Sequence, residues 1–385
     1  FKVTVTSYFG QQTASASTTE LEPEAITATI QRAEALAKIA PPDPEWMPLL
    51  TKQDYPSTPA ACDEATAHLS PLARGEIVEK VCSLARQKQV KSSGTLSTDN
   101  KLFAIGNSQG LFAVSQTTEA DFSFTAKIED GSSWGNLTAY AIKDLPVQAI
   151  ATKTIERAIA SRQPRRLEPG DYTVILEPAA MSSLLPWLVW NLDARAADEG
   201  RSFMSKGEGE NRLGEQIFSS KVNIYRDSAH PLLQTSNFLP DGLSNSYLDI
   251  VRAGIVKNLS YSRYWAKKQG KEATGYFSPL VMAGENQTVA DLIAQTEKGI
   301  LITRAWYVRY VNPRTLEVTG MTRDGTFWIE EGKIAYPIKN LRFNQVLPTM
   351  LHQIESLSQV ARFGQIVVPG AKVKNFHFSS ITDSV

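Results

Sequence analysis

The chain has 385 residues, of which 42% are hydrophobic and 21% are charged, as in soluble globular proteins. This length exceeds one ordinary hydrophobic core, so we expect at least two domains. The 40 Lys and Arg residues balance the 40 Asp and Glu residues, which argues against a dedicated nucleic-acid-binding protein, because such a protein normally carries a basic face.

The first part of the chain predicts a hairpin followed by two helices. Residues 1–10 and 12–18 alternate apolar and polar side chains, as paired strands do. Pro23 suits the first turn of a helix that ends before Pro41. A second helix is predicted to begin at Ser70 and Pro71. The expected buried stripes are Ile26, Ile30, Ala33 and Ala37 in the first helix, and Ile77, Val78, Val81, Leu84 and Ala85 in the second.

Residues 90–141 predict an antiparallel meander, because alternating segments are separated by Asn-Ser-Gln-Gly and Asp-Gly turns. A helix is expected near 146–162. The connection at 162–171 is rich in Pro, Gly and charge, so we place a domain boundary there, between residues 1–165 and 166–385. Its arginines, Arg162, Arg165 and Arg166, are interpreted as a solvated helix end and loop.

The C-terminal half is mostly strand-like. Residues 172–178, YTVILEP, read as a strand, as do segments within 221–227, 254–263, 299–311, 326–338 and 364–378. Two helices are expected, near 288–298 and 344–358. We therefore predict an α+β fold, with an N-terminal antiparallel sheet and packed helices, then a C-terminal antiparallel barrel-like β domain with a few helices.

One apolar run, within Ser182–Phe203, raises the question of a membrane segment. Its apolar core, Leu184–Leu192, is shorter than the roughly 20 residues that a spanning helix needs, and charged residues follow directly. We predict a core helix instead, with Pro186 either in its first turn or kinking it. The expected buried stripe is Met181, Leu184, Leu185, Leu188, Val189 and Leu192.

The two cysteines, Cys62 and Cys82, form no metal-binding or disulfide pattern, and two thiols in a chain of this length suit a reducing cytoplasm. The sequence begins without Met in a strand pattern, so we expect that upstream residues are not included here.

Catalytic motifs are absent from the sequence. The histidines, His68, His230, His352 and His377, offer no HExxH pair, and there is no GxSxG, P-loop or GxGxxG pattern. The most unusual stretch is 304–334, rich in arginine and aromatic residues. On a regular strand Tyr307 and Arg309 share one face, and Trp306, Val308 and Tyr310 share the other. Arg309 and Arg323 could bind a carboxylate, although ordinary cation–π and ion-pair packing is an alternative.

The order and spacing of several segments give the sequence a family resemblance. They are LEPAA, DEGRSF, KQGKEATGY, GILITRAWYVR and TGMTRDGTFWIEEGKIAYPIKNLRFN. In this order the chain resembles the TldD/PmbA family, whose members are described as metallopeptidases and modulators of DNA gyrase. The resemblance covers nearly the whole chain. It implies that the family's first tens of residues precede the FKVTV strand and are missing here.

TldD-type members carry an HExxxH helix after a strand, where two histidines bind zinc and the glutamate serves as base. The resemblance aligns the first histidine near Pro186, the glutamate near Trp187 and the second histidine near Asn191. These members also supply a late cysteine ligand, but no cysteine follows Cys82 here. The chain therefore resembles PmbA (TldE)-type members, which lack the metal motif, and no metal or other cofactor is expected in it.

Three hypotheses follow. The chain is a non-catalytic member that forms a homodimer, or a heterodimer with a TldD-type zinc-bearing paralogue, and takes part in peptide processing. Alternatively, it is a hydrolase that uses Asp324 or Glu330 with His230 or His352, or it is a peptide- or protein-binding module unrelated to proteolysis. We expect a peptide substrate, no nucleic acid and no membrane. The candidate cleft residues are Arg201, Ser202, Arg309, Arg323 and Asp324.

Overall fold

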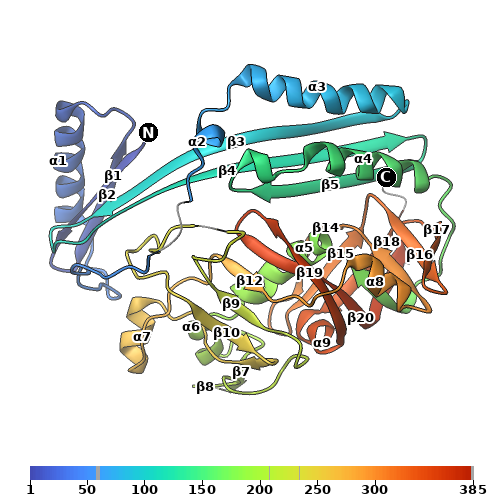
Figure 1. The fold of residues 1–385 in the computed structure, drawn as a ribbon. Helices are drawn as coiled ribbons and strands as arrows, with labels where there is room; N and C mark the ends of the chain where they lie inside the picture. Colours follow the sequence, from blue (N-terminus) through green and yellow to red (C-terminus); the bar gives the residue numbers. More distant parts are fainter. Residues whose placement is uncertain (58–60, 208, 234, 383–385) are drawn as a thin grey trace. The chain divides into compact units, whose positions relative to one another are not determined.

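The computed structural model describes residues 1–57, 61–207, 209–233 and 235–382, and Figure 1 shows the order of its helices and strands. The chain divides into two compact units. The first contains residues 1–49 and 263–272, and the second contains residues 50–262 and 273–385. The domain boundary predicted between residues 165 and 166 falls inside the second unit and stays a prediction.

The first unit contains the predicted hairpin and helix. Its elements are β1 (Val3–Phe9), β2 (Gln12–Thr18), α1 (Pro23–Ile39) and the short helix α7 (Arg263–Gln269). The strands β1 and β2 pair antiparallel, and Pro23 lies in the first turn of α1, as predicted. Ala33 and Ala37 are buried, but Ile30 is 38% exposed and Thr29 takes its place in the buried stripe.

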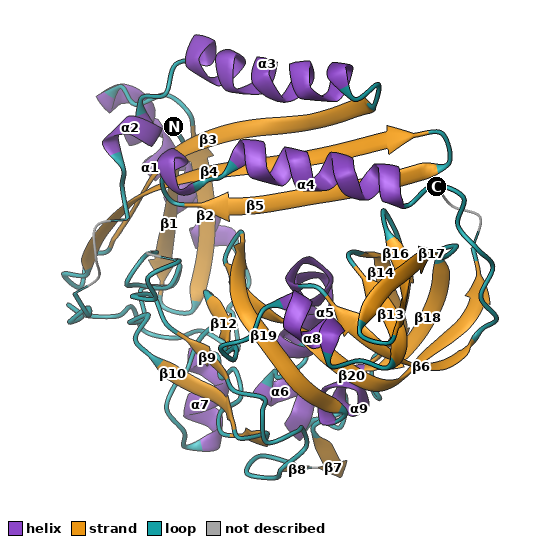
Figure 2. Cartoon of the chain, turned by 45° about the vertical axis from the view of Figure 1, so that its right-hand side comes forward, coloured by secondary structure: helices purple, strands orange, loops and turns teal. Residues whose placement is uncertain are grey.

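The second unit begins with a three-stranded antiparallel sheet, which confirms the predicted meander. Its elements are α2 (Glu64–Ala67), α3 (Pro71–Gln87), β3 (Lys91–Gly106), β4 (Phe112–Ile128), β5 (Gly131–Ala139), the 3-10 turn η1 (Ile142–Asp144) and α4 (Val147–Ala160). Figure 2 shows α3 and α4 side by side along this sheet. Phe122 and Phe124 of β4 form its core with Val81 of α3 and Ile155 of α4. Val78, expected in the core, is 36% exposed.

The remaining helices of the second unit lie between its strands. They are α5 (Pro178–Trp190), α6 (Ala194–Asp198), α8 (Val289–Ala294) and α9 (Leu347–His352). The helix near 288–298 is confirmed in a shorter form. The helix predicted over 344–358 is wrong apart from the six residues of α9, because strands flank it on both sides. Before α9, Leu341, Phe343 and Gln345 are buried alternately, which is a strand pattern.

Most of the strands in the second unit belong to one mixed sheet. They are β6 (Gly170–Leu176), β9 (Ile224–Arg226), β10 (Leu248–Arg252), β11 (Ile255–Val256), β12 (Leu280–Met282), β13 (Lys298–Ile302), β14 (Ala305–Asn312), β15 (Glu317–Thr322), β16 (Thr326–Glu330), β17 (Lys333–Pro337), β18 (Leu341–Val346), β19 (Ile354–Phe363) and β20 (Ile366–Ile381). Apart from it, β7 (Ser205–Gly207) and β8 (Glu210–Asn211) form a small ribbon.

This sheet corrects one part of the fold prediction. The α+β class is confirmed, but the pairing of the described strands does not close into a barrel. The order is β11-β10-β9-β12-β20-β6-β13-β16-β17, and β20 also pairs with β18 and β19. Two of the pairs, β6 with β13 and β12 with β20, are parallel. A parallel pair needs a long crossover, and α5 and α8 lie in the crossover between β6 and β13.

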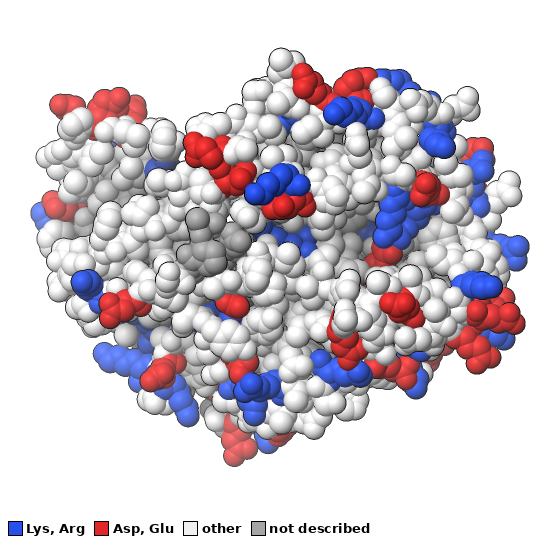
Figure 3. Space-filling model, viewed as in Figure 1, with Lys and Arg blue, Asp and Glu red and all other residues white. Residues whose placement is uncertain are grey.

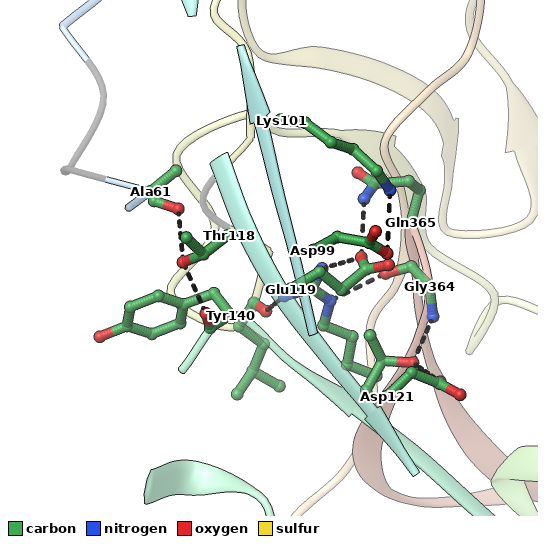
Figure 4. A network of polar contacts seen from close by, with 12 residues as sticks. Ala61, Asp99, Lys101, Thr118, Glu119, Asp121, Tyr140, Gly364 and Gln365 are labelled. Carbon is green, nitrogen blue, oxygen red and sulfur yellow. Dashed lines mark hydrogen bonds and ion pairs between the residues drawn. The ribbon is translucent and has the colours of Figure 1, made fainter. Parts of the chain in front are cut away.

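A buried ion pair joins the three-stranded sheet to the turn between β19 and β20. The Arg362 guanidinium contacts the Glu119 carboxylate of β4 at 2.8 Å, and the Arg362 side chain is 4% exposed. Its other donors reach the main-chain oxygens of Gly364 at 2.8 Å and Leu232 at 3.2 Å. Figure 4 shows Glu119 beside Gln365 in this junction. Long-range contacts of this kind hold the central sheet against the C-terminal sheet.

The interior proline of α5 makes a testable prediction. Pro186 is the ninth residue of the helix, and it has no N–H to donate to the carbonyl of Ser182. We expect Pro186→Ala to raise the free energy of unfolding by about 1–3 kcal/mol, measured by urea denaturation. Pro178→Ala is the matched control, because Pro178 opens the helix, where proline is favoured, and its replacement should give no gain. A loss of stability in Pro186→Ala would contradict the prediction.

Candidate functional site

Helix α5 follows β6 directly and lies deep in the second unit. Glu177 precedes the helix and Pro178 opens it, so Pro186 lies in the interior, and the expectation of a first-turn position is wrong. Leu184 and Leu188 are fully buried, and all six residues of the predicted stripe lie in the core. The apolar face therefore holds the helix in place, and the remaining side chains decide its chemistry.

The three positions that the resemblance aligns with a zinc motif are engaged in packing. The Trp187 ring meets the Tyr310 ring edge-on, with the centroids 4.6 Å apart. The Asn191 Nδ2 donates to the main-chain oxygen of Trp187 at 2.7 Å and to the Tyr310 Oη at 2.7 Å. Pro186 has no side-chain donor atom. Zinc sites use His, Cys and carboxylate ligands, so these residues do not fit a zinc ion.

Metal ligands do not gather elsewhere in the described ranges either, since no group of three or more His, Cys, Asp or Glu residues could hold a metal ion there. Burial lowers the pKa of His230, and its Nδ1 accepts a hydrogen bond from the Leu232 N–H at 3.2 Å. His352 is the exposed last residue of α9. The Asp324 carboxylate is bound to Arg304 at 2.6 Å. Each candidate for an unconventional hydrolase site thus has its own local environment.

A cavity of about 650 Å³ opens at the C-terminal end of α5. Two of its aromatic side chains are widely exposed, Trp190 by 66% and Tyr276 by 67%. Phe103 of β3 stacks on Phe238 there, with ring centroids 5.6 Å apart. The cavity is lined by Phe103, Val189, Trp190, Asp193, Thr235, Ser236, Phe238, Leu239, Pro240, Asn245, Ser260, Tyr276, Phe277, Ser278, Pro279 and Gln365. Its shape and apolar wall suit an extended peptide or another ligand with apolar groups.

A second polar centre lies where β13 and β14 meet β15 and β16. The Arg304 guanidinium is stacked between Trp134 at 4.1 Å and Trp306 at 4.5 Å, and it binds the buried Asp324 carboxylate at 2.6 Å. Burial lowers the pKa of Arg304, although Asp324 acts in the opposite direction. Arg323 lies over the other side of this cluster, 5.0 Å from the Trp306 ring centroid. The arrangement is that of a structural cation–π cluster.

The predicted cleft residues fall into separate places. Ser202 is buried, and its Oγ donates to the main-chain oxygen of Asn191 at 2.9 Å, so it fixes the end of α5. The exposed Arg201 pairs with Glu199 at 2.6 Å. Arg323 and Asp324 belong to the Arg304 cluster, with 3.7 Å between their charged groups. The guanidinium of Arg309 lies 4.4 Å from the Tyr307 ring centroid. The structure therefore groups only Arg323 with Asp324.

The strand faces predicted for 306–310 are partly wrong. The pairing of β14 with β15 shifts register between Trp306 and Arg309, and Tyr307 has a positive φ of 53°. This bulge buries Val308 while Trp306 stays 37% exposed, so these two residues do not share a face. Tyr307 and Arg309 do lie together, as predicted.

Sequence reasoning missed the cavity. Its wall comes from β3, from α5 and from loops at 235–245 and 276–279. Trp190 was visible as a polar-capable aromatic residue at the end of an apolar helix, but its exposure depends on neighbours that are distant in sequence. No local pattern marks loops that converge on one cavity.

The basic residues around the domain connection do not form a shared patch. Arg162 pairs with Glu129, Arg166 pairs with Glu168, and Arg165 stacks on Tyr336 at 4.2 Å. Figure 3 shows Lys and Arg interspersed with Asp and Glu over the viewed face. Within the ranges that the structure covers, no helix combines the length and apolar character needed to cross a membrane.

Comparison with known proteins identifies relatives over almost the whole chain. The model of the PmbA/TldA metallopeptidase central domain matches residues 60–162, and that of the C-terminal domain matches residues 169–380. Metalloprotease PmbA of Escherichia coli O157:H7 is 23% identical, over 96% of this chain and 84% of its own length. The Haemophilus influenzae Metalloprotease PmbA homolog is 23% identical, over 89% of this chain and 78% of its own.

Solved structures share the fold. TldE from Thermococcus kodakarensis superimposes with a TM-score of 0.87 at 19% identity, covering 98% of this chain and 90% of its own. A Bacteroides thetaiotaomicron protein, named as a candidate modulator of DNA gyrase, has a TM-score of 0.86 at 20% identity, covering 98% of this chain and 88% of its own. At these identities the likeness supports the fold alone.

Proposed function

Because the chain belongs to the PmbA/TldD metallopeptidase family, we propose that it is a non-catalytic member that binds peptide and works in proteolysis with a TldD-type chain that supplies the zinc. The observation that carries this proposal is helix α5. Its Pro186, Trp187 and Asn191 stand where the resemblance expects two zinc ligands and a base, and none of the three is a suitable zinc donor or carboxylate base.

The cavity beside α5 supports a role in binding. A peptidase subunit without a metal site can still hold a substrate segment, and a cavity with exposed Trp190 and Tyr276 offers apolar and aromatic contacts for one. The proposal puts the protein in the reducing cytoplasm, in keeping with its two free thiols, Cys62 and Cys82.

The exposed side of β14 supports assembly with another chain. In the described part of the sheet β14 pairs with β15 alone, so one of its edges has no strand neighbour there. Its exposed residues include Tyr307 at 57%, Tyr310 at 42% and Val311 at 49%. An apolar strand edge of this kind is a surface that a partner commonly covers. We propose a TldD-type zinc-bearing paralogue as partner, with a homodimer as the alternative.

The test combines metal analysis with cleavage of an unfolded protein. The purified chain should carry well under one zinc ion per chain and should leave the substrate uncut. Addition of the zinc-bearing paralogue should produce cleavage that a chelator abolishes, and the two chains should co-elute in size-exclusion chromatography. The paralogue alone is the control. Chelator-sensitive cleavage by the isolated chain would contradict the proposal, and peptide binding without any paralogue association would favour a separate binding module.

A further inference from the structure

We propose that the cavity at the end of α5 selects a cationic side chain, lysine or arginine, carried on an otherwise apolar peptide. This inference rests on the proposed function, because it names the kind of peptide that the binding site takes. It is carried by three properties of the cavity wall, namely its charge, its aromatic surface and an unsatisfied acceptor.

The charge of the wall is negative. Asp193 is the one ionisable acid or base among the described lining residues apart from the phenol of Tyr276, and that lining contains no Lys, Arg or His. The Asp193 Oδ1 accepts the Ala196 N–H at 2.7 Å, because Asp193 caps α6. An ionised carboxylate has about four acceptor positions, so one cap leaves capacity for a ligand cation.

The aromatic surface is suited to the same ligand. Trp190 lies three residues before Asp193, and its ring meets Trp187 edge-on with 5.7 Å between centroids. Trp190 and Tyr276 are 66% and 67% exposed, so the faces of both rings are available to a ligand. An ammonium or guanidinium group binds over an aromatic face through the ring quadrupole, while the aliphatic stem of Lys or Arg packs on apolar wall.

The unsatisfied acceptor is the side-chain oxygen of Asn245. This residue lines the cavity and is only 3% exposed. Its Nδ2 donates to the main-chain oxygen of Ser236 at 2.8 Å, but its Oδ1 has no hydrogen-bond partner among the described residues. A buried acceptor without a partner is costly, and a ligand that brings N–H donors relieves this cost. An anionic ligand would bring acceptors instead.

A nearby buried cation does not reverse this preference. Arg226 of β9 is 3% exposed and is not part of the cavity lining. Its guanidinium donates to the main-chain oxygens of Thr274 at 2.6 Å and Tyr276 at 2.8 Å, and burial lowers its pKa to about 10. Its hydrogen bonds are therefore directed to the backbone that supports Tyr276.

The experiment measures binding of labelled, unstructured peptides to the full chain by fluorescence anisotropy. The peptides share one apolar sequence and differ at a single central residue, which is Lys, Arg, norleucine or Glu. We expect the Lys and Arg peptides to bind roughly tenfold more tightly than the norleucine peptide, and the Glu peptide to bind most weakly. The difference should shrink as salt is added.

Two variants test the assigned residues. Asp193→Asn keeps a side-chain oxygen for the helix cap and removes the charge, so it should fold normally and lose most of the preference for Lys. Trp190→Leu should weaken the Lys peptide roughly fivefold. Glu199→Gln, which removes an equal charge outside the cavity lining, is the matched control and should change nothing.

The outcomes separate this inference from the function on which it rests. Equal binding of all peptides, unchanged by Asp193→Asn, would overturn the cation preference and leave the peptide-binding function standing. Tightest binding of the Glu peptide would also overturn the preference. If none of the peptides binds, both the preference and peptide binding at this cavity are wrong.

Discussion

Replacement of Arg362 by methionine is expected to lower the free energy of unfolding by about 3 kcal/mol or more. The change leaves the Glu119 carboxylate, which is 22% exposed, without its cation, and it also removes the donors to the oxygens of Gly364 and Leu232. Breaking a buried pair at one partner is more costly than removing the whole pair, because the remaining charge stays desolvated. Chemical denaturation monitored by tryptophan fluorescence measures the loss.

The matched control for this variant is Arg166→Met. Arg166 also contacts a carboxylate, that of Glu168 at 3.0 Å, but both side chains are more than 70% exposed. Exposed pairs contribute little, so the control should stay within about 0.5 kcal/mol of the original protein. Similar losses in the two variants would show that the burial of Arg362 does not decide its contribution.

The second large effect is expected at Arg304. Arg304→Met removes the ion pair with Asp324, whose side chain is 5% exposed, and the two stacking contacts with Trp134 and Trp306. We expect a loss of about 3 kcal/mol in the free energy of unfolding, measured by urea denaturation. Arg323→Met should cost less, because Arg323 is 29% exposed and lies 3.7 Å from the same carboxylate.

A double-mutant cycle isolates the Arg304–Asp324 interaction. Asp324→Asn keeps the size of the side chain, and asparagine tolerates the positive φ of 57° at this position. Because the two residues are in contact, the combined variant should lose less than the sum of the single losses, with a coupling of about 1–3 kcal/mol. Additive losses would mean that the cation–π contacts, and not the ion pair, account for the effect of Arg304.

The local elements of the fold were predictable from residue patterns. The hairpin β1–β2, the helices α1, α3 and α4 and the meander β3–β5 follow from periodicity and from helix-starting residues such as Pro23 and Ser70. The pattern failed at residues 344–358, where Leu341, Phe343 and Gln345 face the core from a strand that pairs with β15 and β20. Pairing partners far away in sequence decided that segment.

The candidate site divides in the same way. The lack of suitable zinc donors at Pro186, Trp187 and Asn191 was readable at once, since a side chain has a ligand atom or lacks one however the chain folds. The grouping of Arg201, Ser202, Arg309, Arg323 and Asp324 into one cleft was not supported, because their neighbours differ. The cavity at the end of α5 was not foreseen.

The sequence by itself determined the family, the α+β class and the chemistry that helix α5 does not carry, because these depend on residue types, their order and their local spacing. Only the tertiary structure decided the mixed sheet, the Arg362–Glu119 junction across 243 residues of chain, and the negative aromatic cavity beside Trp190 and Asp193. The physical reason is that these features depend on which distant segments meet, and burial and charge pairing between distant segments leave no periodic pattern in either one.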